Sequence, residues 1–149
     1  METIQHHITM FVVMLIVGML FNPMNILAYS TDDLYVSTTL FYGGLLMASN
    51  MIWSHEIVKY LNTKHINKHV FVVGILMSCF SVFLLRSQLF VSHKEWLRRM
   101  IPHHSTALTT TSKLLDNDKS ISDNSEIFRL AKDILYNQDL EIRLMKTLI

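Results

Sequence analysis

The apolar and polar positions of the chain follow two different patterns, which meet near residue 91. Before that point, three stretches are apolar over most of their length, at about residues 8–28, 34–53 and 70–90. Each approaches the roughly 20 residues that an α-helix needs to cross the hydrocarbon core of a bilayer. The pattern therefore predicts three transmembrane helices, which form a membrane anchor within residues 1–91.

The first apolar stretch has a second interpretation. Its end, Ile26-Leu27-Ala28, has the small residue expected before the cleavage point of a secretory signal peptide. However, no lysine or arginine precedes the stretch, and signal peptides usually carry such a charge. We therefore expect a transmembrane helix, kinked near Pro23 because proline removes a backbone donor and clashes with the preceding turn.

Residues 92–149 form a second predicted domain, in which apolar side chains recur at helical spacing. The predicted helices cover about residues 93–116 and 124–148. Because a short loop joins two amphipathic helices, we expect them to pair as an antiparallel hairpin. The whole chain is therefore predicted to be all-α. The first apolar stripe contains Leu97, Met100, Ile101, His104, Ala107, Leu108, Thr111, Leu114 and Leu115.

Both predicted hairpin helices begin at a capping box. Ser92 and Glu95 have the Ser-x-x-Glu form in which the serine oxygen accepts an orphan backbone amide. Asp123 and Glu126 have the equivalent form ahead of the second helix. These local signals predict where each helix starts.

Polar side chains interrupt the apolar stripe of each hairpin helix. His104 stands in the first stripe, and Gln138 and Glu141 stand in the second. If the turn is centred near residues 120–121, antiparallel pairing places His103 and His104 opposite Gln138. The same register places Met100 between Glu141 and Met145, so the polar interruptions of both helices meet at one level.

Buried imidazole, amide and carboxylate groups must either bond to one another or hold an ion. Thioether and imidazole donors suit copper, and Glu141 would extend acceptance toward zinc or iron. The alternative is a hydrogen-bonded network between His104 and Glu141, with Met100 and Met145 as ordinary core residues. Five other histidines are expected to be solvated or interfacial rather than ligands: His6, His7, His55, His65 and His69.

Composition supports a membrane protein and excludes several functions. The chain of 149 residues is 50% hydrophobic and only 17% charged. Its 13 Lys and Arg are scattered among 12 acids, so there is no basic face for nucleic acid. The single cysteine, Cys79, excludes an intrachain disulfide. No catalytic triad, phosphate-binding glycine loop or paired-carboxylate motif is present, and we predict no enzymatic activity.

The charge distribution predicts an orientation in the inner or plasma membrane. The basic connection at residues 54–68 should lie in the cytoplasm, because short cytoplasmic loops carry an excess of Lys and Arg. The amino terminus is then cytoplasmic and the carboxy-terminal domain extracytoplasmic. Three basic residues just after the third apolar stretch favour the opposite orientation, so the positive charges on the two sides of the membrane are nearly balanced: Lys94, Arg98 and Arg99.

Two motifs at the predicted site resemble a known family. The Met-x-x-His-His motif at residues 100–104 and the Gln-x-x-Glu-Ile-x-x-Met motif at residues 138–145 resemble the helical domain known as domain of unknown function 305. Together with Arg86-Ser87-Gln88, the three apolar stretches resemble its membrane-anchored bacterial subgroup, so the resemblance covers essentially the whole chain. Members are described as ferritin-like helical bundles, usually exported, and some are linked to copper binding through Met and His.

The resemblance implies a metal site in the carboxy-terminal domain. Two positions depart from the family pattern, because members often have an acidic residue at His93 and some have Met at Leu97. A ligand set that depends on either position would differ here. The implied ligands are Met100, His103, His104 and Met145, supported by Gln138 and Glu141.

We weigh two hypotheses of function. The first is a membrane-anchored protein that binds copper for storage, tolerance or handover, with lipid and the metal ion as its partners. The second is a structural or assembly protein whose spans form a homo-oligomer through Gly44 and Ala48, where small residues let helices approach closely. A redox enzyme that uses the same metal ranks third.

Overall fold

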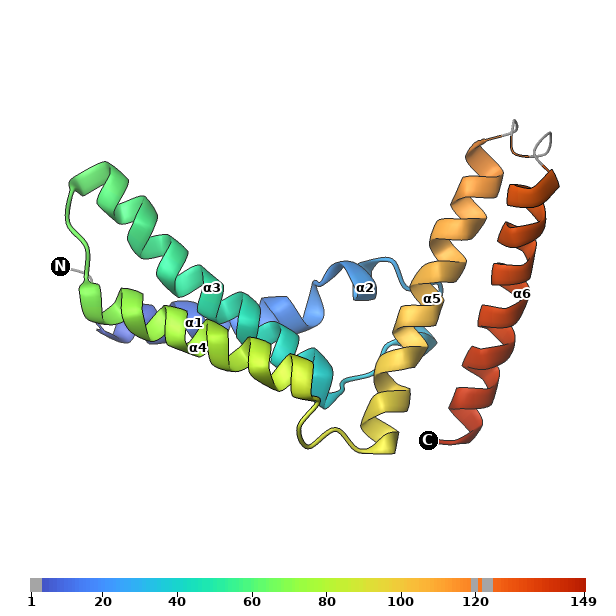
Figure 1. Ribbon diagram of the computed structural model, residues 1–149, viewed down its shortest axis with the longest axis horizontal. Coiled ribbons are helices and arrows are strands. Elements are labelled where there is room, and N and C mark those ends of the chain that lie inside the picture. The colour runs from blue at the N-terminus through green and yellow to red at the C-terminus, as the bar shows by residue number, and fades with distance from the viewer. Residues whose placement is uncertain (1–3, 119–120, 122–124) are drawn as a thin grey trace. The chain divides into compact units, whose positions relative to one another are not determined.

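The computed structural model describes residues 4–118, 121 and 125–149, and every regular element in these residues is helical. The all-α prediction is therefore confirmed. The described residues form two compact units, which are treated separately below. The elements are α1 (Ile4–Leu20), α2 (Pro23–Ile26), the 3₁₀ turn η1 (Thr31–Asp33), α3 (Thr38–Thr63), α4 (Lys68–Ser87), α5 (His93–Asn117) and α6 (Ser125–Thr147) (Figure 1).

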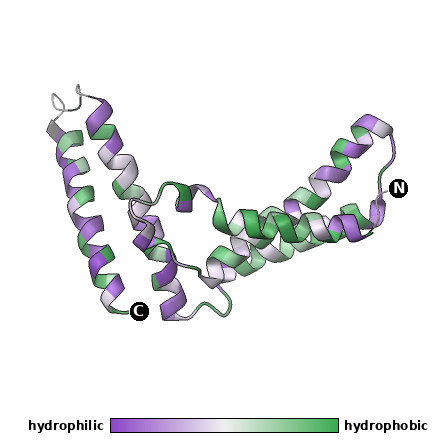
Figure 2. Cartoon of the chain, turned by 180° about the vertical axis from the view of Figure 1, so that it is seen from behind, coloured by the Kyte–Doolittle hydropathy of each residue, from purple (hydrophilic) through white to green (hydrophobic). Residues whose placement is uncertain are grey.

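The first unit contains α1, α3 and α4, from the described residues up to Asn22 together with Thr38–Val91. Helix α3 packs against both α1 and α4. Local signals fix the limits of α4: the Asn67 side chain accepts a hydrogen bond from the Val70 amide at 3.3 Å, and Gln88 ends the helix with a φ of 49°. Figure 2 shows that α1 and α4 are hydrophobic over most of their length.

Glycines allow the three helices to approach one another closely. A Cβ added to Gly44 would lie 2.8 Å from Cγ of Met19 on α1. A Cβ added to Gly74 would lie 3.0 Å from the backbone nitrogen of Trp53 on α3. Ala48 is completely buried. Gly44 therefore packs against α1, and Ala48 is covered within the same unit.

Two of the three predicted spans correspond to helices that are long and apolar enough to cross a membrane. In the described residues these are Ile4–Ile26 and Lys68–Ser87. The predicted span at residues 34–53 does not qualify. Its helix, α3, begins only at Thr38 and continues to Thr63 through polar residues such as Asn50 and Glu56.

The first candidate span has an interruption where proline was expected to disturb it. Helix α1 ends at Leu20, and α2 begins at Pro23. Proline fits the first turn of a helix because its missing N–H would have had no partner there. The helix also starts at Ile4, earlier than the predicted residue 8.

The second unit contains α2, η1, α5 and α6, from Pro23–Ser37 and Ser92–Ile149. The predicted division at residue 91 had assigned residues 23–37 to the membrane anchor, whereas in the structure this segment groups with the carboxy-terminal helices. Helices α5 and α6 lie side by side and run in opposite directions (Figure 1). Their contact buries Leu97, Ile101, Leu108, Ile142 and Met145, and Tyr35, Met100, Leu135 and Ile149 pack against this cluster.

Helix α5 begins where its capping box predicted. The Ser92 hydroxyl accepts a hydrogen bond from the Glu95 amide at 3.3 Å. Pro102 lies buried inside this single helix, which continues to Asn117. The second capping box depends on Asp123, which lies outside the described residues.

Candidate functional site

The polar interruptions of α5 and α6 meet at His104 and Glu141. Nδ1 of His104 lies 2.9 Å from Oε2 of Glu141. Within α6, Nε2 of Gln138 donates to the same Glu141 oxygen at 3.5 Å. The sequence had placed His104 opposite Gln138, so the observed register differs by about one helical turn.

Burial controls the charge state of His104. Its side chain is 20% exposed, whereas that of Glu141 is 49% exposed. Loss of hydration lowers the pKa of His104 below its usual value, and this effect outweighs the neighbouring Glu141 carboxylate, which raises the pKa. His104 is therefore neutral at pH 7, with a lone pair available on one ring nitrogen.

The contact between His104 and Glu141 is close but not a well-directed hydrogen bond. Nδ1 of His104 is buried and has no hydrogen-bond partner of normal geometry. The short distance therefore represents an electrostatic contact. Because Nδ1 faces this carboxylate, the other ring nitrogen, Nε2, is the one whose lone pair can bind a ligand.

The two methionines lie in the apolar cluster beside this pair. Met145 is 7% exposed, and Met100 packs against the same cluster. Met100 precedes His104 by one turn and Met145 follows Glu141 by one turn, so the opposite helix directions place both thioethers at one level. The sulfur atoms thus belong to the core between α5 and α6.

His103 is the exposed neighbour of His104. It is exposed, and its ring centre is 5.8 Å from that of His104, with the ring planes inclined at 60°. Among the described residues, no three His, Cys, Asp or Glu side chains gather closely enough to hold a metal ion. A site here would consequently depend on the methionines.

The second unit contains a buried acid that was not among the predicted site residues. Asp33 of η1 is 4% exposed, and its Oδ2 accepts a hydrogen bond from the Ser105 hydroxyl at 2.6 Å. Nζ of Lys146 lies 2.6 Å from Oδ1. The Tyr29 amide donates to the Ser105 oxygen at 2.7 Å. These contacts attach the Pro23–Ser37 segment to both α5 and α6.

Distance along the chain explains why this cluster was missed. Asp33 and Ser105 are 72 positions apart, and the acids at residues 32–33 have the composition of an ordinary exposed turn. The available signal was Ser105 itself, a polar residue one turn after the buried Ile101. The Asp33 contact raises the pKa of Lys146, chiefly through the hydrogen bond to the carboxylate.

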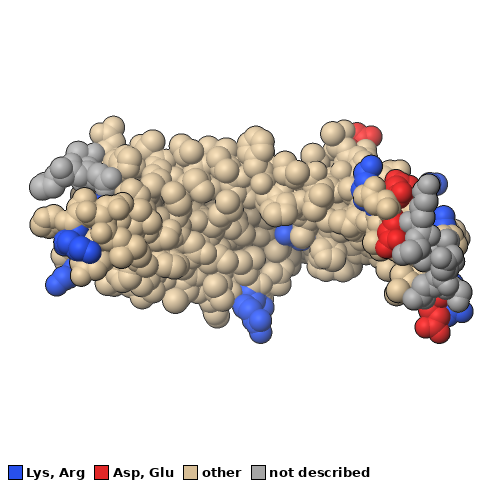
Figure 3. Space-filling model, turned by 90° about the horizontal axis from the view of Figure 1, so that it is seen from above, with Lys and Arg blue, Asp and Glu red and all other residues tan. Residues whose placement is uncertain are grey.

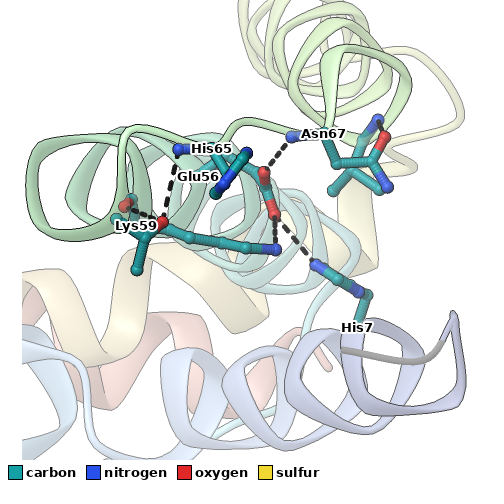
Figure 4. Close-up of polar contacts among 7 residues, drawn as sticks. His7, Glu56, Lys59, His65 and Asn67 are labelled. Atoms are coloured by element: carbon teal, nitrogen blue, oxygen red, sulfur yellow. Dashed lines mark hydrogen bonds and ion pairs between the residues drawn. The ribbon is translucent and has the colours of Figure 1, made fainter. Parts of the chain in front are cut away.

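A second missed acid lies in the first unit. Glu56 of α3 is completely buried (Figure 4), with Oε1 3.2 Å from Nε2 of His7 and 3.5 Å from Nζ of Lys59. The Asn67 amide donates to Oε2 at 2.6 Å. These three partners compensate for the hydration that the buried carboxylate has lost.

His7 does not have the solvated or interfacial environment expected from the sequence. It is 8% exposed and packs against Glu56. Its ring centre lies 5.8 Å from that of His6 and 6.2 Å from that of His55. The cluster links α1 to α3 at the end of α3 that leads into α4.

Comparisons with known proteins agree with the resemblance seen in the motifs. Residues 85–149 match the family model described as "Domain of unknown function (DUF305)". The chain is 31% identical over 131 residues to "Uncharacterized protein L153" of Acanthamoeba polyphaga mimivirus, covering 86% of this chain and 81% of the viral protein. No solved structure matches the chain.

The two matches cover different shares of the molecule. The family model begins near the end of α4 and includes α5 and α6 with both motifs. The similarity to the viral protein is longer and extends into the helices of the first unit. The chain therefore belongs to one family with the mimivirus protein L153 and carries a DUF305 domain at residues 85–149.

Proposed function

We propose that this protein is a membrane-anchored metal-binding protein, and that it holds copper between α5 and α6 for storage, tolerance or handover. The observation that carries the proposal is His104, a neutral imidazole whose Nδ1 lies 2.9 Å from Oε2 of Glu141, an arrangement that leaves Nε2 to bind a metal ion. Burial lowers the pKa of this imidazole and so maintains the neutral form that binds metals.

The neighbouring side chains favour a soft ion. Met100 and Met145 belong to the core cluster between α5 and α6, one turn from His104 and Glu141 respectively, and soft sulfur donors select Cu(I). His103, on the exposed side, is the fourth proposed ligand. Glu141 and Gln138 support the site, because a carboxylate beside a ligating imidazole orients the ring and increases its basicity.

The proposed anchor has three spans: α3 and, on either side of it in the sequence, the two helices that are long and apolar enough to cross a membrane. Two polar groups of α3 are covered: Ser49 is completely buried and bonds to the Leu45 carbonyl, and Glu56 is completely buried among its partners. Covered and bonded polar groups lower the cost of placing such a helix in lipid. The orientation we propose has a cytoplasmic amino terminus and an extracytoplasmic, ferritin-like hairpin of α5 and α6.

Copper titration of the full-length protein in detergent tests the metal site. Cu(I) should bind in competition with a chelator of known affinity, and His103→Ala combined with His104→Ala should abolish binding. Met100→Leu with Met145→Leu keeps the apolar volume and should weaken Cu(I) binding more than Zn(II) binding. Equal Cu(I) affinity in wild type and the His103/His104 double variant would overturn the assignment.

A matched control separates this site from histidines elsewhere. His65 and His69 lie in and just after the connection between α3 and α4, in the first unit. His65→Ala with His69→Ala should leave Cu(I) affinity unchanged. A loss of binding in this control would move the site away from α5 and α6.

A structural role is the second candidate, and the 2.9 Å contact between His104 and Glu141 favours it. In that case the pair, with Gln138, aligns α5 with α6, and the methionines are core residues. His104→Ala would then lower the stability of the metal-free protein, and added copper would leave the stability of the wild type unchanged. A copper-dependent increase in unfolding temperature contradicts a purely structural role.

A further inference from the structure

The first unit contains an apolar groove between α1 and α4. Its volume is about 360 Å³, and apolar atoms make up nearly all of its lining. Ile8 and Phe11 of α1 form one wall, Val73 and Met77 of α4 form the other, and Ile52 of α3 lies between them. Helix α3 packs against both outer helices and contributes Ile52 to the lining of the groove.

The walls of the groove indicate what can fill it. Its two outer helices, α1 and α4, are those with the length and hydropathy of membrane spans, and most of their surface is not covered by the rest of the protein. Val72 and Val73 of α4 are both about half exposed, at 52% and 53%. In the membrane proposed above, such a groove faces hydrocarbon, and an acyl chain is the occupant whose chemistry matches its lining.

One end of the groove is basic and rich in histidine. His7 and His69 are part of its lining, and Lys68 starts α4 beside His69. Between residues 38 and 70 the sequence has Lys59, Lys64 and Lys68 but a single acid, Glu56. At the end of the unit where α3 leads into α4, the described residues on the face in view in Figure 3 include basic side chains and no Asp or Glu.

Among the described residues, Glu56 is the single acid at this end, and it does not neutralise the rim. Glu56 is completely buried and already contacts His7, Lys59 and the Asn67 amide. Lys68 is exposed. Basic side chains at the surface of a membrane attract anionic lipid headgroups, each contributing about fivefold in affinity.

We propose that this groove is a binding site for a phospholipid with an anionic headgroup. One acyl chain lies between α1 and α4 over Ile52, and the phosphate lies at the rim formed by Lys68 and His69. This inference rests on the membrane placement proposed above and is independent of the metal site in the second unit.

Fluorescence quenching by brominated lipids tests the site in the full-length protein. Trp53 follows Ile52 in α3 and packs against Gly74, so it reports on this part of the unit once Trp96→Phe removes the other tryptophan. The protein is reconstituted in vesicles that contain either phosphatidylglycerol or phosphatidylcholine with brominated acyl chains. Phosphatidylglycerol should quench Trp53 at a several-fold lower mole fraction than phosphatidylcholine.

Two pairs of variants identify the groove and its rim. Val73→Phe fills the groove and should remove most of the preference for phosphatidylglycerol, whereas Val72→Phe, on the adjacent exposed valine outside the lining, should retain it. Lys68→Gln should reduce the preference about fivefold. His65→Gln, which lies outside the groove lining, should retain it.

The outcomes separate this site from the membrane anchor. Protein that floats with vesicles but is quenched equally by both lipids overturns the lipid site and leaves the anchor in place. Equal effects of Val73→Phe and Val72→Phe also overturn it, because the preference would then not depend on the groove. Protein that does not float with vesicles overturns the anchor and the lipid site together, while copper binding by the second unit remains measurable.

Discussion

Replacing Asp33 with alanine should destabilise the second unit more than any neighbouring surface substitution. The carboxylate is 4% exposed and accepts two short contacts, from Ser105 and Lys146, each at 2.6 Å. Removing it leaves the fully buried Ser105 hydroxyl without its acceptor and Lys146 without its ion-pair partner. Asp33→Ala therefore disrupts the attachment of the Pro23–Ser37 segment to α5 and α6 at once.

The magnitude follows from the exposure of each partner. A hydrogen bond to a charged group contributes about 1.5–3 kcal/mol, and breaking a buried ion pair costs about 3–5 kcal/mol. Lys146 is 32% exposed, so its ammonium group can regain water and the cost falls toward the lower figure. We expect a loss of about 2–3 kcal/mol in the free energy of unfolding, which is roughly 30- to 150-fold in the folded-to-unfolded ratio.

Urea unfolding of the full-length protein in detergent measures this loss. Trp96 lies in α5, and Trp53→Phe leaves it as the single tryptophan, so its fluorescence follows the second unit. Asp32→Ala is the matched control, because Asp32 adjoins Asp33 but is exposed. If Asp33→Ala and Asp32→Ala change the free energy of unfolding equally, the reasoning is refuted.

The pH dependence of the same pair has a defined sign. The contact with Asp33 raises the pKa of Lys146 above its ordinary value of 10.5, so the pair is fully stabilising below that pH and its contribution is lost as the pH rises through the folded-state pKa. The stability difference between wild type and Lys146→Met should therefore be constant from pH 7 to 9. It should decrease in more alkaline solution. A difference that vanishes below pH 9 would contradict this sign.

Three further predictions concern single residues in both units. Gly44→Ala should destabilise the first unit by about 1–3 kcal/mol, because the added methyl group overpacks the contact with α1. Gly43→Ala is the control and should be neutral or stabilising, because its Cβ meets nothing within 4 Å. Equal thermal stability of the two variants would contradict the packing of α1 on α3. Because the pKa of His104 is lowered, its neutral state stabilises the fold above pH 6.5, and this contribution is lost as the pH falls through the folded-state pKa. His104→Gln should therefore make the free energy of unfolding depend less on pH between pH 7 and 4.5. Glu56→Gln should cost about 1–3 kcal/mol in the free energy of unfolding near neutral pH, because the buried carboxylate loses its charged contacts with His7 and Lys59. Equal stability of Glu56→Gln and the wild type would refute the role of this charge.

Local signals predicted much of the second unit correctly. Helix α5 starts at His93 because the Ser92 hydroxyl accepts the Glu95 amide, an interaction between residues three positions apart. The apolar spacing also identified Leu97, Ile101 and Leu108 as core residues. Such features depend on neighbours within one or two helical turns, so they are visible in the sequence.

The register of α5 against α6 was harder to predict. The expected turn centre placed His104 opposite Gln138, whereas the structure brings it to Glu141, about one turn away. A hydrophobic stripe that repeats at each turn fits its partner almost equally well after a shift of one turn. The site residues could therefore be identified from the sequence, but their pairing could not.

The sequence by itself determined that the protein is all-α, that α1 and α4 have the length and hydropathy of membrane spans, and that polar residues interrupt the apolar faces of α5 and α6. These properties are set by composition and by helical periodicity. Only the tertiary structure decided which distant groups meet. Asp33 is buried by residues 72 and 113 positions away, and Glu56 is buried by His7 at 49 positions. The physical reason is that the residues next to a charged side chain in the sequence do not show whether it is buried. Such a side chain loses its hydration only when segments remote in the sequence cover it and supply its partners.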